Sequence, residues 1–308
     1  MNQALVHLGR RLRQAGYHFT TTTPATHERV LARGLDERAP GGLRLASDLR
    51  DVFGWSRPFE ASLLGDELLG LLDQAGELHR VGAHYRSGLR FSSLGDLLLA
   101  HSAYPTTAAD SIFFGPDTYR FCALLDRFAT PADVVADIGC GSGAGGLWLA
   151  CAQPRREVIL TDINARALDV ACANAAMAGI EVRTVQSDLF AALPELPDLC
   201  VANPPYMRDA QQRAYRDGGG QHGEGLSMRI VREWLMRARA GQSLVLYTGS
   251  AIVAGVDAIR AQVTALAAQQ SVQLDYLEID PDVFGEELSL ATYADVERIA
   301  AVGMRLTR

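Results

Sequence analysis

The sequence predicts an α/β protein with a doubly wound, mostly parallel seven-stranded sheet, preceded by a smaller, mainly helical domain. From residue 133 onward, short apolar segments alternate with amphipathic segments of helix length, which is typical of parallel strands covered on both faces. Before that point, helical periodicity over 1–74 is followed by short segments that alternate like strands. A chain of 308 residues is long enough for two domains, which we expect at 1–110 and 111–308.

The segment before residue 110 has the element order of a winged-helix module. Apolar spacing at Leu5, Leu8 and Leu12 predicts a first amphipathic helix. Further helices are predicted over Ala25–Leu35, Leu43–Phe53, Pro58–Leu64 and Glu67–Gln74, and strands over Leu78–Val81 and Tyr85–Phe91, with Gly82 and Gly88 as turn residues. The helix over Glu67–Gln74 is apolar and acidic, so we expect it to pack or to bind a partner instead of reading DNA.

The second domain is predicted element by element from the same periodicities. Strands are expected at Val134–Asp137, Val158–Asp162, Val182–Gln186, Leu199–Ala202, Ser243–Thr248, Leu274–Ile279 and Val296–Leu306. Helices are expected at Gly143–Ala152, Ala165–Ala178, Leu226–Ala238 and Ala254–Gln269.

Composition excludes several classes of protein. The 48% hydrophobic and 21% charged residues are close to the globular average. The apolar runs are too short to cross a bilayer and the N-terminus lacks an export signal, so we expect a cytoplasmic protein without a membrane span. All 29 basic residues are arginine, which excludes phosphate grips and Schiff bases that need lysine. The five cysteines lack the spacing of zinc ligands, so no metal is expected.

A glycine-rich loop at 139–146 joins the first predicted sheet strand to a helix. Glycine lets the backbone approach a ligand closely, and a helix N-terminus favours negative charge. By itself this loop leaves the ligand open. Gly141, Gly143 and Gly146 also fit the dinucleotide-binding pattern, with Asp162 in the place of its ribose-binding acid.

Three acids narrow the choice of ligand because they end the first three predicted sheet strands. They are Asp137, Asp162 and Asp188. Such a set suits an amino-acid-bearing nucleoside, with one acid for the ammonium group, one for the ribose hydroxyls and one for the adenine amine. The alternative is that the acids only cap helices or strand ends.

The fourth predicted strand ends in Asn203-Pro-Pro-Tyr206. Consecutive prolines fix the turn and remove two backbone donors, so carbonyl oxygens stay available as acceptors. The Asn203 side-chain oxygen and the Pro204 carbonyl can each accept one N–H of a planar NH2 group, while Tyr206 stacks on the flat substrate. Catalysis would then rest on positioning for in-line displacement, without a strong general base. The alternative is a turn that only ends the strand.

Over residues 112–250 these motifs resemble class I S-adenosylmethionine-dependent methyltransferases, which have a Rossmann-like sheet. The Asn-Pro-Pro-Tyr motif is most similar to that of the methyltransferase small domain group, above all the release-factor glutamine methyltransferases, and also to adenine-amine methyltransferases of ribosomal and transfer RNA. The resemblance implies S-adenosyl-L-methionine as the cofactor and Asn203, Pro204, Pro205 and Tyr206 as catalytic residues. It implies cofactor-binding residues at Phe114, Pro116, Asp117, Thr118, Asp137, Gly139, Gly141, Gly143, Asp162, Ile163, Asp188, Leu189 and Asn203.

Two features depart from the release-factor enzymes. The motif Phe114-Gly-Pro-Asp-Thr-Tyr119 ends in Asp-Thr-Tyr where those enzymes typically carry Glu-Thr-Glu. The N-terminal segment is winged-helix-like instead of a plain helical bundle. Both departures argue against a release factor as the substrate.

The predicted activity is methyl transfer to a planar amide or amine nitrogen, of a protein glutamine or a nucleobase. A small-molecule methyltransferase of a biosynthetic pathway is the alternative among enzymes, and a cofactor-sensing binding module is the alternative outside them. A nicotinamide dehydrogenase is disfavoured because hydride transfer has no use for paired amine acceptors. The net charge of −7 argues against RNA, so a protein or small-molecule acceptor is expected.

Two loops are candidates for contact with the acceptor. Tyr215–Gly225 is glycine-rich and precedes a helix, so it suits a lid that brings Arg216, His222 or Glu224 to the substrate. The alternative is an exposed loop that caps the helix. Phe284–Leu288 lies between the last two predicted strands, where substrate-selecting loops sit in this fold, and its alternative is an ordinary exposed turn.

Overall fold

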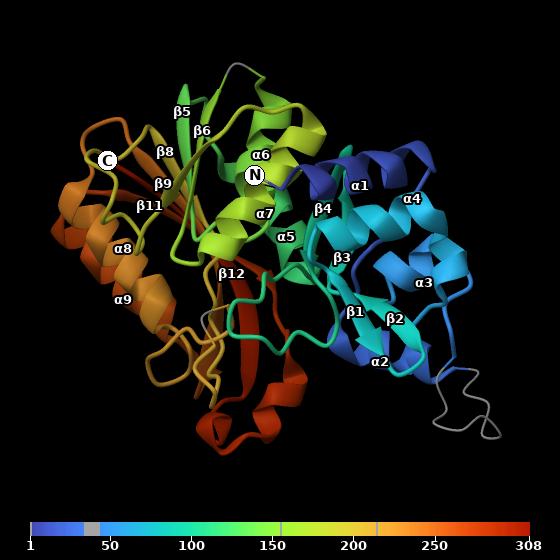
Figure 1. Ribbon diagram of the computed structural model, residues 1–308. Helices are drawn as coiled ribbons and strands as arrows, with labels where there is room; N and C mark the ends of the chain where they lie inside the picture. The colour runs from blue at the N-terminus through green and yellow to red at the C-terminus, as the bar shows by residue number, and fades with distance from the viewer. Residues whose placement is uncertain (1, 34–43, 155, 214) are drawn as a thin grey trace.

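The computed structural model describes residues 2–33, 44–154, 156–213 and 215–308. The chain forms an N-terminal part of helices and two hairpins, which lies beside a larger part built around one sheet (Figure 1). The predicted α/β class and mostly parallel sheet are confirmed.

The large sheet has the strand order β11-β12-β9-β8-β5-β6-β7. Its strands are β5 (Val134–Ile138), β6 (Glu157–Asp162), β7 (Arg183–Gln186), β8 (Leu199–Ala202), β9 (Ser243–Val253), β11 (Gln273–Asp280) and β12 (Arg298–Thr307). The five strands from β7 to β9 are parallel, whereas β12 runs antiparallel to both β9 and β11. A short strand, β10 (Val256–Asp257), folds back on the end of β9.

Helices cover both faces of this sheet. They are α5 (Pro116–Phe128), α6 (Ala144–Ala152), α7 (Ala165–Ala178), α8 (Gly225–Arg237) and α9 (Ala258–Gln269). Because side chains alternate along a strand, Ala136 packs in a core with Trp234 of α8 and Val263 of α9, while its neighbour Val135 packs in a core with Phe121 of α5. The carboxyl ends of the parallel strands are therefore left open between the two layers of helices.

The N-terminal part contains the helices and the hairpin that the sequence predicts. Its elements are α1 (Gln3–Gln14), α2 (Pro24–Ala32), α3 (Leu49–Phe53), α4 (Ala61–Gln74), β1 (Leu78–Val81), β2 (His84–Ser87), β3 (Leu89–Leu94) and β4 (Leu97–Ser102). The two predicted helices on either side of residue 65 form one element with a kink at Gly65, whose φ is 65°. A winged-helix arrangement of these elements stays a prediction.

Several boundaries differ from the sequence prediction for local reasons. The expected strand Tyr85–Phe91 is divided at Gly88, and its second half begins a separate hairpin of β3 with β4. Of the two glycines predicted as turn residues, Gly82 lies in the β1–β2 turn and Gly88 lies between β2 and β3. Helix α9 begins at Ala258 instead of Ala254, because β9 extends to Val253 and β10 comes first. The helix ends predicted at positions 35 and 43 lie outside the described residues.

The N-terminal part shares a core with the large sheet's helix α7. Leu5 and Leu8 of α1 lie in one apolar cluster with Val170 and Met177 of α7. The buried Asn174 of α7 exchanges two hydrogen bonds with the backbone of Ala100 in β4. Its amide also donates to the Ser142 carbonyl in the glycine-rich loop, at 2.9 Å. A division at 110/111 is thus a proposal about chain organisation, and the packing continues across it.

Within the described parts of the chain, every helix is too short or too polar to cross a lipid bilayer.

Candidate active site

The glycine-rich loop between β5 and α6 is shaped by backbone that only glycine adopts easily. Gly139, Gly141 and Gly143 have φ values of 67°, 53° and 80°. Two of the predicted acids hold this loop in place. The Gly146 N–H donates to Asp137 Oδ2 at 2.8 Å, and the Gly141 N–H donates to Asp162 Oδ2 at 2.9 Å.

Burial raises the pKa of both acids. Asp137 is almost fully buried under the loop, and this desolvation raises its pKa to about 7. Desolvation also raises the pKa of Asp162, although N–H groups of Asn164 and Gly141 bind its carboxylate. Their first role is therefore to fix the loop, and each keeps lone pairs for a ligand.

Asp188 is placed differently from the other two acids. Both of its oxygens accept hydrogen bonds from Arg229 of α8, at 3.0 and 2.9 Å, and its side chain is half exposed. An adenine amine at this rim would meet a carboxylate that is already paired with a guanidinium. The predicted contact of Asp188 with the adenine stays a prediction.

The Asn203–Tyr206 turn follows directly from the end of β8, opposite the glycine-rich loop. The Asn203 side chain is partly buried, lines the cavity and makes no hydrogen bond to another described residue. The Pro204 carbonyl likewise receives no backbone hydrogen bond from the described chain. Two acceptors therefore stand free at the position where the sequence predicts them.

Tyr206 turns into the protein in this structure. Its ring lies 6.0 Å from Phe284 in an edge arrangement and 6.2 Å from Tyr247, and its hydroxyl is buried without a hydrogen bond to a described residue. A Cβ on Gly249 would come within 2.2 Å of the ring, so only glycine fits there. Stacking of this ring on an acceptor stays a prediction.

The motif before the first sheet strand forms the N-terminus of α5. Thr118 caps this helix by accepting from the Gly115 N–H at 3.2 Å. Asp117 is buried and accepts from Tyr247 at 2.7 Å and from Arg120 at 3.2 Å. Phe114 is also buried, but it stacks on His101 with ring centroids 4.9 Å apart.

These elements surround one central cavity of about 350 Å³. Predicted residues that line it are Asp117, Thr118, Asp137, Gly139, Gly141, Asp162, Ile163, Asp188, Leu189, Asn203, Pro204, Pro205 and Tyr206. Three predicted residues, Phe114, Pro116 and Gly143, are not among its lining. The structure thus brings together most of the predicted cofactor-binding set and all four residues of the predicted catalytic motif.

Sequence reasoning missed several residues of the cavity wall. Phe113 lines it in place of Phe114 and is 41% exposed, and Phe121 of α5 lines it from below. The signal for Phe121 was available in principle, because it follows Thr118 by three residues, about one helical turn, and so lies on the same face of α5. Tyr247 does not line the cavity but binds the lining residue Asp117, and it could not be found because this contact joins residues 130 positions apart.

The loop at 215–225 packs on the Asn203–Tyr206 turn. The Gly218 N–H donates to the Met207 carbonyl at 2.8 Å. A Cβ on Gly223 would come within 2.1 Å of the Tyr206 carbonyl oxygen. Arg216 and Asp217 line the cavity, whereas His222 binds Asp295 at 3.0 Å and Glu224 accepts from the N–H groups of its own loop. Of the predicted lid contacts, only Arg216 faces the cavity.

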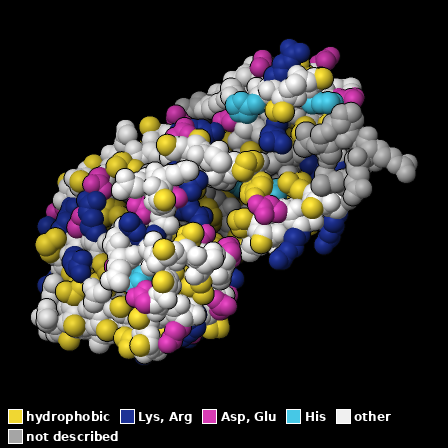
Figure 2. All heavy atoms as spheres, turned by 90° about the horizontal axis from the view of Figure 1, so that it is seen from below, with side chains coloured by type: hydrophobic (Ala, Val, Ile, Leu, Met, Phe, Trp, Pro, Cys, Tyr) yellow, Lys and Arg dark blue, Asp and Glu magenta, His cyan; other side chains and the backbone are white. Residues whose placement is uncertain are grey.

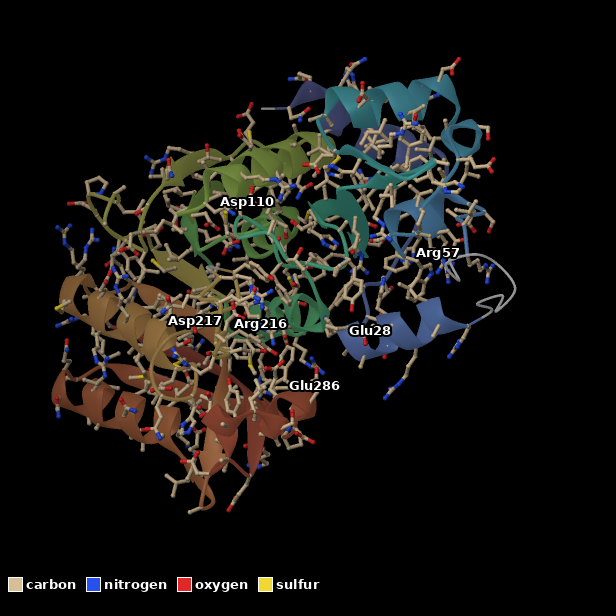
Figure 3. The ribbon with its side chains drawn as sticks, turned by 60° about the horizontal axis from the view of Figure 1, so that its bottom comes forward. Glu28, Arg57, Asp110, Arg216, Asp217 and Glu286 are labelled. Carbon is tan, nitrogen blue, oxygen red and sulfur yellow. The ribbon has the colours of Figure 1, made fainter. Side chains whose placement is uncertain are left out.

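The cavity opens toward a hollow between the two parts of the molecule. Figure 2 shows this hollow from below, with hydrophobic side chains at its edge. In Figure 3, Arg216 and Asp217 lie on the side of the sheet, and Glu28 and Arg57 lie across from them on the N-terminal part. Arg216 is paired with Glu287, and Arg57 lies 3.3 Å from Asp51. An acceptor entering here would meet paired arginines instead of free cations.

The part of the sequence that forms this site is similar to that of known proteins. Residues 122–216 match the family model of the methyltransferase small domain. This segment is therefore similar to the class I methyltransferase small domain. The range contains the glycine-rich loop, all three acids and the Asn203–Tyr206 turn, so the resemblance stated from the motifs is confirmed, and S-adenosyl-L-methionine is the cofactor of this class.

Relatives of this domain differ in what they act on. The release factor glutamine methyltransferase of Deinococcus radiodurans is 35% identical over 156 residues, which are 50% of this chain and 55% of that protein. The ribosomal RNA small subunit methyltransferase C of Hamiltonella defensa is 40% identical over 86 residues, which are 28% of this chain and 26% of that protein. The chain therefore spans about half the length of the first relative and a quarter of the second.

The fold of the methyltransferase domain is also found in solved structures. Wild-type Trm5b from Pyrococcus abyssi superposes with a TM-score of 0.50 at 14% sequence identity, over 73% of this chain and 58% of that one. At this identity the likeness concerns the fold alone.

The cavity has the chemistry that S-adenosyl-L-methionine requires. Gly139 and Gly141 leave the loop backbone without side chains along its wall, which suits close approach of a nucleoside. At the end formed by α5, Asp117 offers an Oδ2 oxygen that accepts no hydrogen bond from the described residues, which suits an ammonium group. The exposed side chain of Ile163 offers an apolar surface at the opposite rim.

Proposed function

We propose that the protein methylates a planar NH2 nitrogen, and that the acceptor is the side-chain amide of a protein glutamine. The observation that carries this proposal is the pair of free acceptors at Asn203 and Pro204 in the wall of the central cavity. Methyl transfer to oxygen or carbon has no use for two fixed acceptors side by side, whereas an NH2 group has two N–H donors to satisfy.

In this mechanism the chain mainly positions the acceptor. The Asn203 side-chain oxygen and the Pro204 carbonyl each accept one N–H, which fixes the plane of the NH2 group and directs its lone pair into the cavity. S-adenosyl-L-methionine would supply the electrophilic methyl group there. The two acceptors also stabilise the positive charge that grows on nitrogen, because each N–H becomes a stronger donor as the charge develops. As the N–C bond forms the S–C bond would break, S-adenosylhomocysteine would leave, and one N–H proton would pass to solvent to give the neutral N-methyl product.

Two observations favour a protein acceptor over RNA. The Deinococcus radiodurans relative, matched over 156 residues, acts by its name on release factor glutamine, and the net charge of this chain is −7. A ribosomal RNA adenine is the second candidate, because the Hamiltonella defensa relative shares the domain. A small metabolite with a flat NH2 group is the third.

The test is transfer of a radiolabelled methyl group from S-adenosyl-L-methionine into a bacterial lysate that is then separated into protein, RNA and small molecules. We expect the label in the protein fraction, on N-methylglutamine after enzymatic digestion and chromatography, and released as methylamine on acid hydrolysis. Label in the RNA or metabolite fraction would replace the glutamine proposal, and no label in any fraction would contradict methyl transfer to any of the three.

Asn203→Ala tests the role of the turn. We expect turnover to fall about 100-fold or more, because the acceptor loses one of two fixed contacts, while the dissociation constant of S-adenosylhomocysteine measured by calorimetry stays nearly constant. Gln211→Ala, which removes an exposed amide in the following loop, is the control and should keep full turnover. Equal loss of turnover and cofactor affinity in Asn203→Ala would show that Asn203 is structural.

A further inference from the structure

A buried polar cluster extends from the wall of the cavity into the protein. It consists of Asp117 on α5, Tyr247 on β9 and Tyr206 at the end of the Asn203–Tyr206 turn. The Tyr247 hydroxyl donates to Asp117 Oδ1 at 2.7 Å, and both side chains are nearly inaccessible to solvent. A hydrogen bond from a neutral phenol to a carboxylate in so dry a place is strong, and losing it leaves the carboxylate poorly solvated.

Three side chains affect the ionisation of Asp117, namely Tyr247, Arg120 and Tyr206. Arg120, one turn along α5, reaches Oδ1 at 3.2 Å and continues to Asp280 of β11 at 2.9 Å. Tyr206 adds a hydroxyl close enough to Asp117 and Tyr247 for both to raise its own pKa, although it makes no well-formed hydrogen bond to either. Burial raises the pKa of Asp117, and the hydrogen bond from Tyr247, the nearby Tyr206 hydroxyl and the charge of Arg120 oppose that rise.

The hydrogen bonds from Tyr247 and Arg120 both fall on one oxygen of Asp117. Oδ1 holds Tyr247 and Arg120, so Oδ2 is the oxygen left to the cavity that Asp117 lines. A carboxylate held in this way presents one lone-pair direction to a ligand, and only a rigid partner on the other side can fix that direction. Arg120 is one-third exposed, whereas Tyr247 is fully buried in a close-packed core and is the more rigid of the two.

We propose that Tyr247 is a positioning residue, which orients Asp117 for the ammonium end of the cofactor and at the same time forms the wall on which Tyr206 of the acceptor turn rests. This inference rests on the proposed function, because it assigns the methionine end of the cofactor to the Asp117 side of the cavity. It makes Tyr247 a link between the cofactor-side carboxylate, to which it donates, and the ring of the acceptor turn, which lies 6.2 Å away.

Two cofactor analogues separate this role from simple packing. S-adenosylhomocysteine carries the ammonium group, and 5′-methylthioadenosine lacks the whole amino-acid portion. In Tyr247→Phe the ring stays and the hydroxyl goes, so we expect affinity for S-adenosylhomocysteine to fall about tenfold and affinity for 5′-methylthioadenosine to stay unchanged in calorimetry. In an Asp117→Asn background, Tyr247→Phe should have no further effect on S-adenosylhomocysteine, because the group it orients is gone.

The matched control is Tyr276→Phe. Tyr276 also donates to a carboxylate, that of Asp257, at 2.8 Å, but Asp257 does not line the cavity, whereas Asp117 does. It should leave the affinity for both analogues unchanged. A thermal melt of each variant checks that the fold is kept.

The pH dependence of binding gives a second readout with a definite sign. The Tyr247 bond favours the ionised form of Asp117, so its removal should make Asp117 protonate at a higher pH. The loss of S-adenosylhomocysteine affinity on acidification should therefore begin at a higher pH in Tyr247→Phe than in the unsubstituted protein.

Three results would overturn the inference. Equal weakening of both analogues would show that Tyr247 acts through packing alone, and no weakening of either would remove it from the site. An additive effect of Tyr247→Phe and Asp117→Asn would show that the two residues act separately. Failure of the unsubstituted protein to bind S-adenosylhomocysteine is a different outcome, since it would contradict the proposed function itself and the inference with it.

Discussion

Asp137 and Asp162 bind backbone before they bind any ligand. Each accepts an N–H from the glycine-rich loop, so loop shape and carboxylate position are coupled at both ends of the loop. This coupling explains why acids at strand ends and glycines in the following turn occur together. A loop that must approach a nucleoside closely has few side chains to hold it, and a buried carboxylate holds it through its N–H groups.

The raised pKa of Asp137 has a measurable effect on stability. Its folded-state pKa of about 7 lies above the ordinary value, so between about pH 4 and 7 the folded chain keeps a proton that the unfolded chain releases. This group should therefore lower the free energy of unfolding as the pH rises through that window. In Asp137→Asn that contribution is removed, and urea unfolding at several pH values should show a shallower decline.

The same titration can contradict the assignment. Identical slopes for Asp137→Asn and the unsubstituted protein, with equal m values, would show that Asp137 ionises normally in the folded chain.

Local capping decided which elements could be located accurately from the sequence. Helix α7 begins and ends where predicted, because Asn164 caps its first turn and Gly179 adopts the left-handed conformation at its end. Helix α5 was not predicted, because its first turn had been interpreted only as a cofactor-contact motif. The β3–β4 hairpin was also not predicted, because its strands are buried on both sides and their sequences show little alternation of apolar and polar residues.

The site was predictable as far as parallel strands determine it. Strand ends of one parallel sheet meet at one edge, so Asp137, Asp162 and Asn203 had to lie close together. The partners that come from other elements could not be predicted, as with Arg229 on Asp188 and Tyr247 on Asp117. The inward position of Tyr206 depends on such a partner too, since Gly249 leaves the space for its ring.

The loop at 215–225 gives a prediction about glycine. Gly223 has a φ of 107° and no room for a Cβ beside the Tyr206 carbonyl, so Gly223→Ala should displace this loop or the turn beneath it. We expect turnover to fall at least tenfold, as measured with the labelled acceptor. Gly219→Ala is the control, because Gly219 also has a positive φ but open space around it. Equal turnover in the two variants would show that the loop does not need to pack on the turn.

The two parts of the molecule depend on each other for folding. Asn174 joins β4 to the glycine-rich loop by three buried hydrogen bonds, and α1 completes the apolar cover of α7. Asn174→Ala leaves three buried backbone groups without partners, so we expect a loss of roughly 2–4 kcal/mol in the free energy of unfolding. Gln262→Ala on the exposed face of α9 should change it by less than about 0.5 kcal/mol.

Denaturant unfolding followed by fluorescence and by circular dichroism checks this prediction. Because the core is shared, both signals should give one coincident transition. A separate transition for each part, or a loss below about 1 kcal/mol in Asn174→Ala, would show that the contact across α7 contributes little.

The shared core also limits how such enzymes can be recombined. A chimera that exchanges residues 1–110 for the corresponding region of a relative would set a foreign helix against Val170 and Met177. It would also leave Asn174 facing an unrelated strand. Such an exchange should succeed only when the outer face of α7 is transplanted together with the N-terminal region.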